Sequence, residues 1–231
     1  MVLEESHSRL SSEDRGPIIG LGKGRLESLT DGIFGTVMTV LVLSLSVPII
    51  ISGSPAFENS QLITSLRGLL PDIFSYIISF AILGSFWVRH HTMFFFVTTV
   101  NRILLGLNIA FLLTIGFIPF STALLGLYPT LELSLIIYGM NLIATSIASQ
   151  ILWIYAVRKK LVSHDTIDER NISRITRRMT LGWLSYVIAI FVSFIDPLLT
   201  LALYIITLLF FIFNTGIGIR IRRPKVPKSE F

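Results

Sequence analysis

Six long apolar stretches without Asp, Glu, Lys or Arg follow one another along the chain, at residues 33–51, 73–88, 103–131, 133–157, 179–195 and 197–219. A helix needs about 20 apolar residues to cross roughly 30 Å of hydrocarbon. Four of the stretches are long enough alone, and the second and fifth reach this length with flanking residues such as Leu69 and Ile175. The alternating pattern of a membrane β-barrel is absent from the sequence. We therefore predict an all-α, polytopic membrane protein with six transmembrane helices.

Breaker residues and charges set the expected boundaries. Helix 1 should run from Lys23 to about Ile51, followed by an outer loop at 52–60. Helix 2 should start near Pro71, helix 3 should reach Leu127, helix 4 should end at the basic cluster 158–160, and helices 5 and 6 should flank Asp196 after an inner loop at 161–174. This gives a flexible cytoplasmic arm at 1–22, one transmembrane domain at 23–219 and a basic tail at 220–231.

The basic residues are distributed asymmetrically between the expected loops. If the N-terminus is cytoplasmic, the inner segments hold every Lys and Arg of the 19 in the chain except Arg67. Cytoplasmic loops of membrane proteins carry such an excess, so both termini are expected inside the cell. This topological signal explains the net charge of +5 better than nucleic-acid binding does.

Composition and motifs argue against an enzyme. With 52% hydrophobic and 14% charged residues the chain could not cover a water-facing surface, and with no cysteine it has no disulfide or thiolate site. His90 and His91 are adjacent, so on one helix they point about 100° apart and cannot chelate one metal together. No phosphate loop, HExxH or Ser–His–Asp pattern is visible, and no cofactor is expected.

The most informative segment is the inner end of helix 1, which includes Arg25, Thr30 and Asp31. Ionisable groups near a membrane are costly unless they are paired or face water. Asp31 could therefore form a structural latch to Arg25, Arg89 or a histidine, or it could face permeating ions. Asp31 lies about 100° or more around the helix from the stripe of Gly32, Thr36, Thr39 and Leu43, which favours the latch.

Farther along helix 1, Thr36, Thr39, Val40 and Leu43 stand at i, i+3, i+4 and i+7, on one helical face. Periodicity alone allows this face either to pack against neighbouring helices or to line a pore.

Several of these residues carry a resemblance to a known family. The sequence Arg25-x-x-x-Leu29-Thr30-Asp31 is similar to the RxxxFSD signature of the transmembrane protein 175 family, the endolysosomal potassium channel and its six-helix bacterial and archaeal relatives. The similarity continues through residues 39–43, recurs at residues 86–91, and includes Asn108 and the stretch 117–120. Leu29-Thr30 replaces Phe-Ser conservatively. Thr36 stands where the family commonly has a bulky aliphatic residue, which would widen the inner ring.

The resemblance implies a homotetrameric, potassium-permeable cation channel with helix 1 around the axis. Thr36, Thr39, Val40 and Leu43 would then line the pore. A structural polar network would comprise Arg25, Thr30, Asp31, Trp87, His90, His91 and Asn108. The sequence has no TVGYG filter, so selectivity would come from side chains.

Two other functions remain open at this stage. A secondary transporter, proton-coupled or not, usually shows internal repeats and broken helices. A non-conducting membrane scaffold would give no flux. In each case the expected partners are membrane lipids, with monovalent cations for a channel or a transporter, and the expected location is the plasma membrane of a prokaryote.

Overall fold

The computed structural model describes residues 22–163 and 167–214, so residues 1–21 of the predicted arm (1–22) and the whole predicted basic tail (220–231) lie outside the described residues. The elements are α2 (Lys23–Val40), η1 (Leu41–Ser44), α3 (Pro55–Gly68), α4 (Leu70–Phe96), α5 (Arg102–Gly116), α6 (Ile118–Leu127), α7 (Glu132–Arg158), α8 (Glu169–Ser193) and α9 (Pro197–Asn214).

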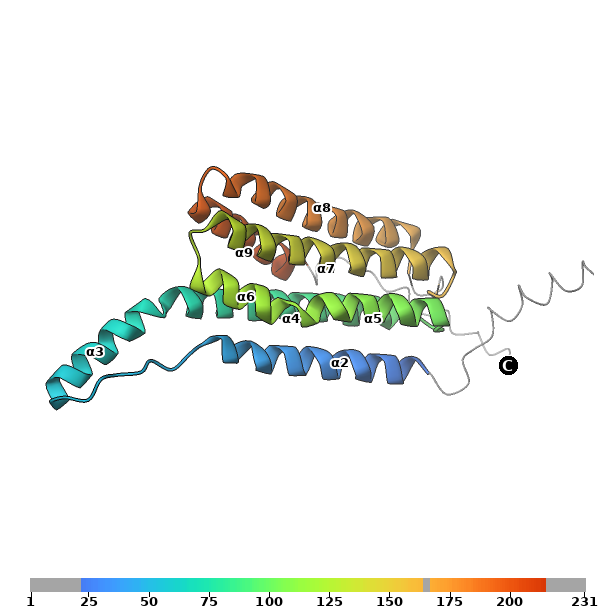
Figure 1. Cartoon of the computed structure of the whole chain (residues 1–231). Helices are drawn as coiled ribbons and strands as arrows, with labels where there is room; N and C mark the ends of the chain where they lie inside the picture. The colour runs from blue at the N-terminus through green and yellow to red at the C-terminus, as the bar shows by residue number, and fades with distance from the viewer. Residues whose placement is uncertain (1–21, 164–166, 215–231) are drawn as a thin grey trace, which may run out of the picture.

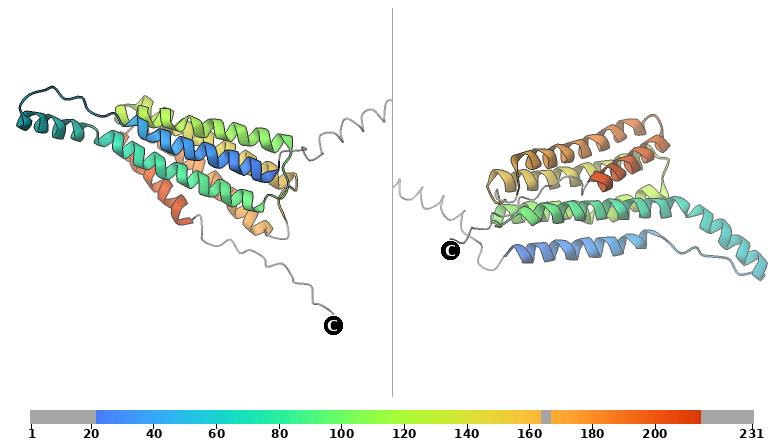
Figure 2. Two further views of the ribbon diagram at one scale, coloured as in Figure 1. Left: turned by 90° about the horizontal axis from the view of Figure 1, so that it is seen from below. Right: turned by 180° about the vertical axis from the view of Figure 1, so that it is seen from behind.

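The helices form an elongated bundle in three groups (Figure 1). α2 lies along one side, α4 to α6 form the middle, and α7 to α9 form the opposite side. Seen from below, α2 lies between α4 and α5 (Figure 2), and it contacts both helices. The prediction of an all-α membrane fold is confirmed. Five spans in the described part are long and apolar enough to cross a membrane, whereas α9 is apolar but shorter, so the sixth crossing stays a prediction.

Helix 1 ends earlier than predicted. The α-helical part of α2 stops at Val40 and the 3₁₀ turn at Ser44, not near Ile51, and residues 45–54 are not helical. Pro48 lacks an N–H group and disfavours helical geometry at the preceding residue. The β-branched residues Val47 and Ile49 on either side favour an extended backbone.

The predicted outer loop 52–60 is also wrong, because α3 begins at Pro55. The Ser54 hydroxyl accepts a hydrogen bond from the Phe57 amide (3.4 Å), and Glu58 accepts one from the Gly53 amide (2.9 Å). A Ser N-cap followed by Pro and an acidic residue is a helix-start signal that the sequence contains. α3 runs almost directly into α4 and projects beyond the bundle (Figure 1).

Predicted helix 3 is broken in two at Phe117, since Pro119 removes a backbone donor at the start of α6. Asn141 of α7 satisfies the backbone groups at this break. With its amide oriented to match its partners, it donates to the Thr114 carbonyl (3.1 Å) and accepts from the Ile118 amide (3.2 Å) and the Ser121 hydroxyl (3.0 Å). A break buried in protein is how membrane helices tolerate proline.

The two inner loops pair with each other. The Thr98 amide donates to the Leu161 carbonyl (2.8 Å), and the Ser163 amide donates to the Phe96 carbonyl (3.0 Å). Val97 and Val162 form an isolated antiparallel bridge. The second of these loops is shorter than predicted, because α8 begins at Glu169 rather than after Arg174. Asn171 and Met179 are buried on this added helix and Ile172 is partly buried. Arg174, one turn after Asn171, is also partly buried and donates from Nη1 to the Asn171 Oδ1 (3.1 Å).

Candidate functional site: the exposed face of α2

α2 has one face buried against the bundle and one face left open. Leu26, Thr30, Phe34 and Val37 are buried, as is Leu41 at the start of the 3₁₀ turn. Their spacing of three to four residues makes one stripe, which packs on α4 and α5. The opposite face contains the exposed residues Gly32, Gly35, Thr36, Thr39 and Leu43.

The four predicted pore residues all lie on the open side. The exposed fractions are 42% for Val40 and 76% for Leu43, and both threonines are also exposed. Leu43 belongs to the 3₁₀ turn and not to the α-helix, so it does not complete a regular α-helical stripe as predicted. A 3₁₀ turn rises about 2 Å per residue against about 1.5 Å in an α-helix, so the segment is slightly longer than an α-helix would make it.

The threonine hydroxyls are oriented by the backbone of α2 itself. Thr36 Oγ1 donates to the Gly32 carbonyl (2.8 Å), and Thr39 Oγ1 donates to the Thr36 carbonyl (2.8 Å). A hydroxyl has one hydrogen and two lone pairs. Because each hydrogen is used inside the helix, what remains is an oxygen that can only accept hydrogen bonds or contact a cation.

A buried chain of polar groups holds the inner end of α2 to α4 and α5. Asn108 Nδ2 donates to Thr30 Oγ1 (3.0 Å), and Thr30 Oγ1 donates in turn to the Leu26 carbonyl (3.0 Å). His90 Nε2 and Asn108 Oδ1 are 2.9 Å apart, so the amide oxygen accepts and His90 carries its proton on Nε2. The exposed fractions of Thr30, His90 and Asn108 are at most 3%.

A second contact is made nearer the surface. Trp87 Nε1 donates to Asp31 Oδ1 (2.8 Å), and the His91 ring stacks on the Trp87 ring with 5.7 Å between centroids. The two histidines therefore point to different partners, as their adjacency predicted. Asp31 has Trp87 rather than Arg89 as its partner, and Arg25 is exposed in the first turn of α2.

The members of these contacts are predictable from the sequence, but their pairing is not. Asn108 is the residue that joins Thr30 to His90, whereas the sequence indicates only that it bonds across some helix interface. The sequence predicts that Asn141 also bonds across a helix interface, but not that it satisfies the break between α5 and α6, although a buried Asn level with a proline kink is a usable signal. No group of three His, Cys, Asp or Glu in the described ranges could hold a metal ion.

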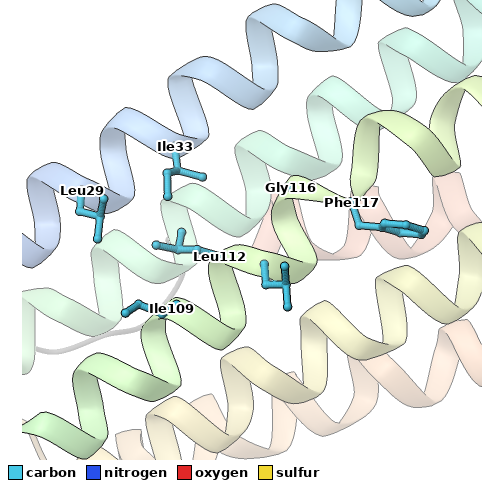
Figure 3. A pocket seen from close by; sticks show the side chains of 7 residues that line it. Leu29, Ile33, Ile109, Leu112, Gly116 and Phe117 are labelled. Atoms are coloured by element: carbon cyan, nitrogen blue, oxygen red, sulfur yellow. The ribbon is translucent and has the colours of Figure 1, made fainter.

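An apolar groove of about 600 Å³ runs beside the open face of α2. Leu29 and Ile33 of α2 form one side, and Ile109, Leu112 and Gly116 of α5 form the other (Figure 3). Phe117, at the break between α5 and α6, closes its end. The groove is open along its length, so the side of α2 that faces α5 is not sealed within one chain.

Five long apolar helices joined by short connections define a polytopic helical membrane protein. In the described part of this protein, the face of α2 that carries apolar side chains and threonine hydroxyls is not covered by other helices. Comparisons with known proteins narrow this class. The family described as "Endosomal/lysosomal potassium channel TMEM175" matches residues 25–119. A potassium channel of Streptomyces collinus is 31% identical over 196 residues, which cover 83% of this chain and 92% of the relative. The chain therefore belongs to the TMEM175 family, a family of channels and not of enzymes.

A solved structure and a vertebrate relative extend the comparison. The crystal structure of a lysosomal potassium-selective channel TMEM175 homolog from Chamaesiphon minutus superposes with a TM-score of 0.72 at 28% identity, covering 84% of this chain and 98% of that one. The endosomal/lysosomal proton channel TMEM175 of Gallus gallus is 34% identical over 102 residues, which are 43% of this chain and 20% of that protein. Relatives thus carry both a potassium-channel and a proton-channel name.

Proposed function

We propose that four copies of this chain surround a central axis with α2 innermost and conduct potassium through a short constriction in the plasma membrane. The observation that carries this proposal is the uncovered face of α2. In the described part of one chain the hollows beside this face are open grooves, and closed rotational symmetry would bring identical faces together around an axis.

The chemistry of the face suits a cation. From Gly32 to Ser54 the sequence has no charged side chain, so an ion would meet only hydroxyl oxygens and apolar groups. A ring of Thr39 hydroxyls, with their hydrogens directed to the backbone, would replace part of an ion's water shell. Potassium holds its water less tightly than sodium, so partial replacement favours potassium without a carbonyl filter.

Leu43 and Thr36 would form the ends of the constriction. A ring of Leu43 side chains would be an apolar collar that can close by dewetting. Thr36, in place of a bulky aliphatic residue, would leave the inner ring wider and wetter. The small residues Gly32 and Gly35 permit close approach of neighbouring helices.

The absence of cysteine makes a direct test of the pore simple. We would introduce Thr39→Cys, reconstitute the full chain into potassium-loaded liposomes, and add a small cationic thiol reagent. The expected result is loss of potassium flux in this variant only. Ile188→Cys on α8 is the matched control, because its side chain is exposed but lies outside the proposed pore.

Unimpeded flux through modified Thr39→Cys would refute the pore assignment. A pH-sensitive dye in the same vesicles would separate proton from potassium movement, and proton flux alone would refute the proposed ion. Native mass spectrometry should find four chains of 25.9 kDa each, and a monomer would exclude the central path.

A further inference from the structure

Arg89 is placed differently from its neighbours on α4. Trp87 and His90 contact α2 and α5, whereas the Arg89 guanidinium lies over the ring of Phe211 on α9, with 5.0 Å from Cζ to the ring centroid. It also lies over Phe86, one turn earlier on α4, at 4.3 Å. Arg89 therefore extends into the side of the bundle formed with α8 and α9, away from the proposed pore face.

Two nitrogens of this guanidinium are buried and have no hydrogen-bond partner in the described ranges, namely Nε and Nη2. Their N–H bonds lie on the same edge of the planar group, which is the edge that binds an anion with two parallel hydrogen bonds. The aromatic faces contact the guanidinium plane and leave this edge free. A buried cation without a partner is strongly destabilising, so the edge requires an occupant.

Two serine hydroxyls on α7, those of Ser146 and Ser149, are also buried without a hydrogen-bond partner in the described ranges. The antiparallel register of α7 and α8 is set by Gln150–Thr180 (2.8 Å) and Trp153–Thr176 (3.2 Å). This register puts Ser149 level with Gly182, the residue against which Phe211 packs.

Tyr186 connects the two observations. It lies one turn after Gly182 on α8, level with Ser146, and is close enough to Arg89 for an electrostatic interaction. Arg89, Ser146, Ser149 and Tyr186, here called the Arg89 cluster, thus share one depth among α4, α7, α8 and α9. The four buried unpartnered polar atoms found in the described ranges all belong to it.

We propose that the Arg89 cluster binds one small inorganic anion of the size of chloride inside each subunit. The guanidinium edge would donate two hydrogen bonds, and the serine hydroxyls would donate the others. Water could accept these bonds but would leave the positive charge uncompensated in a low-dielectric interior, whereas an anion satisfies both requirements. The site is independent of the proposed pore.

Thermal unfolding of the purified full chain tests this proposal. At constant ionic strength, replacing gluconate by chloride should raise the unfolding midpoint and reach saturation, because a ligand that binds only the folded state stabilises it. Gluconate is a much larger anion than chloride and serves as the comparison that should not bind. Arg89→Gln should lose the chloride dependence, and Ser149→Ala should need about fivefold more chloride, equivalent to one ordinary hydrogen bond.

The matched control is Arg102→Gln, which removes an exposed positive charge at the start of α5 and should keep the full response. An equal chloride response in Arg89→Gln, or no response in the unaltered chain, would overturn the proposal. If Arg89→Gln does not fold, crystals of the unaltered chain grown in bromide test directly whether an anion occupies the Arg89 cluster. An anomalous peak within hydrogen-bond distance of Nε and Nη2 supports the site, and a water or empty density there refutes it.

Discussion

Single hydroxyl and methyl groups decide what the open face of α2 can do. Thr36 and Thr39 each direct their hydrogen to the carbonyl three or four residues before, so both oxygens are acceptors toward the open side. Leu43, one of the most exposed large apolar side chains of this segment, presents only carbon. We therefore expect changes of the threonines to alter the ion preference, and changes of Leu43 to alter how readily the proposed pore closes.

Thr39→Val should lower the preference for potassium over sodium by about fivefold, since the interaction of one hydroxyl oxygen with the ion contributes roughly 1 kcal/mol. The change keeps the shape of the side chain and removes only the oxygen. Reversal potentials under bi-ionic conditions measure the ratio. Thr39→Ser keeps the oxygen and should keep the preference, and an unchanged ratio in Thr39→Val would place selectivity elsewhere.

Leu43→Ala should raise basal potassium conductance severalfold, because a smaller apolar collar is wider and easier to wet. Single-channel recording in planar bilayers would show it as a higher open probability without stimulus. Leu198→Ala on α9 removes the same atoms from another highly exposed site and should have no effect. Equal conductance in both variants would contradict the collar.

At the scale of helices, α2 depends on a few polar contacts for its rotation about its own axis. Thr30 is fixed from α5 through Asn108, and Asp31 is fixed from α4 through Trp87. These contacts approach α2 from two sides, so together they define which face stays open. A helix held by apolar contacts alone could turn more easily, since dispersion is not directional.

Asp31→Ala should therefore reduce assembly more than it changes selectivity. Without the carboxylate the Trp87 indole N–H loses its partner, and α2 can rotate so that the threonines turn away from the proposed axis. Native gels report the oligomer and reversal potentials report the ion ratio. Trp87→Phe, which keeps a ring to stack on His91 but lacks the N–H, should reproduce the defect. Normal assembly with a sharply altered ion ratio would show that Asp31 faces the ions instead.

The sequence predicts the long membrane-spanning helices well, because charged side chains are costly in the hydrocarbon core and are therefore rare within such helices. Helix ends are less predictable, as Pro48 ends α2 early and Ser54 begins α3 within an expected loop. The pairing of Thr30, Asn108 and His90 could not be derived, because it joins residues of three helices and depends on how those helices rotate against one another. From the sequence, Arg89 is only one of many basic residues expected near the cytoplasmic side. Its contact with the Phe211 ring in the structure shows that its side chain is directed toward α9.

At the scale of the whole molecule, charge distribution and fold agree on an orientation. The first residues of α2, α5 and α8 and the last of α4 and α7 lie at the same end of the bundle, and most basic residues of the described part are there (Figure 1). Arg67 lies on α3, which projects from the other end. The positive-inside rule therefore predicts that the paired loops face the cytoplasm.

Cysteine labelling tests this orientation on a background free of native thiols. In intact cells a membrane-impermeant maleimide should label Ser60→Cys on α3 and should leave Ser163→Cys unlabelled until the cells are opened. Both positions lie outside the expected spans. Ser60 is exposed and Ser163 is partly buried, so labelling of Ser163→Cys in opened cells is needed to show that this position can react. Labelling of Ser163→Cys in intact cells would reverse the topology.

The pairing of the two inner loops also bears on how the chain is made. Val97 and Val162 are separated by α5, α6 and α7, so their bridge cannot form until all three helices have been synthesised. At roughly 5–20 residues per second, the stretch between them takes several seconds to translate. During that interval the carbonyl of Phe96 and the amide of Thr98 must be hydrated at the membrane surface, because their partners do not yet exist. The inner end of α4, which carries Trp87 and His90, is thus completed only after α7 has been synthesised.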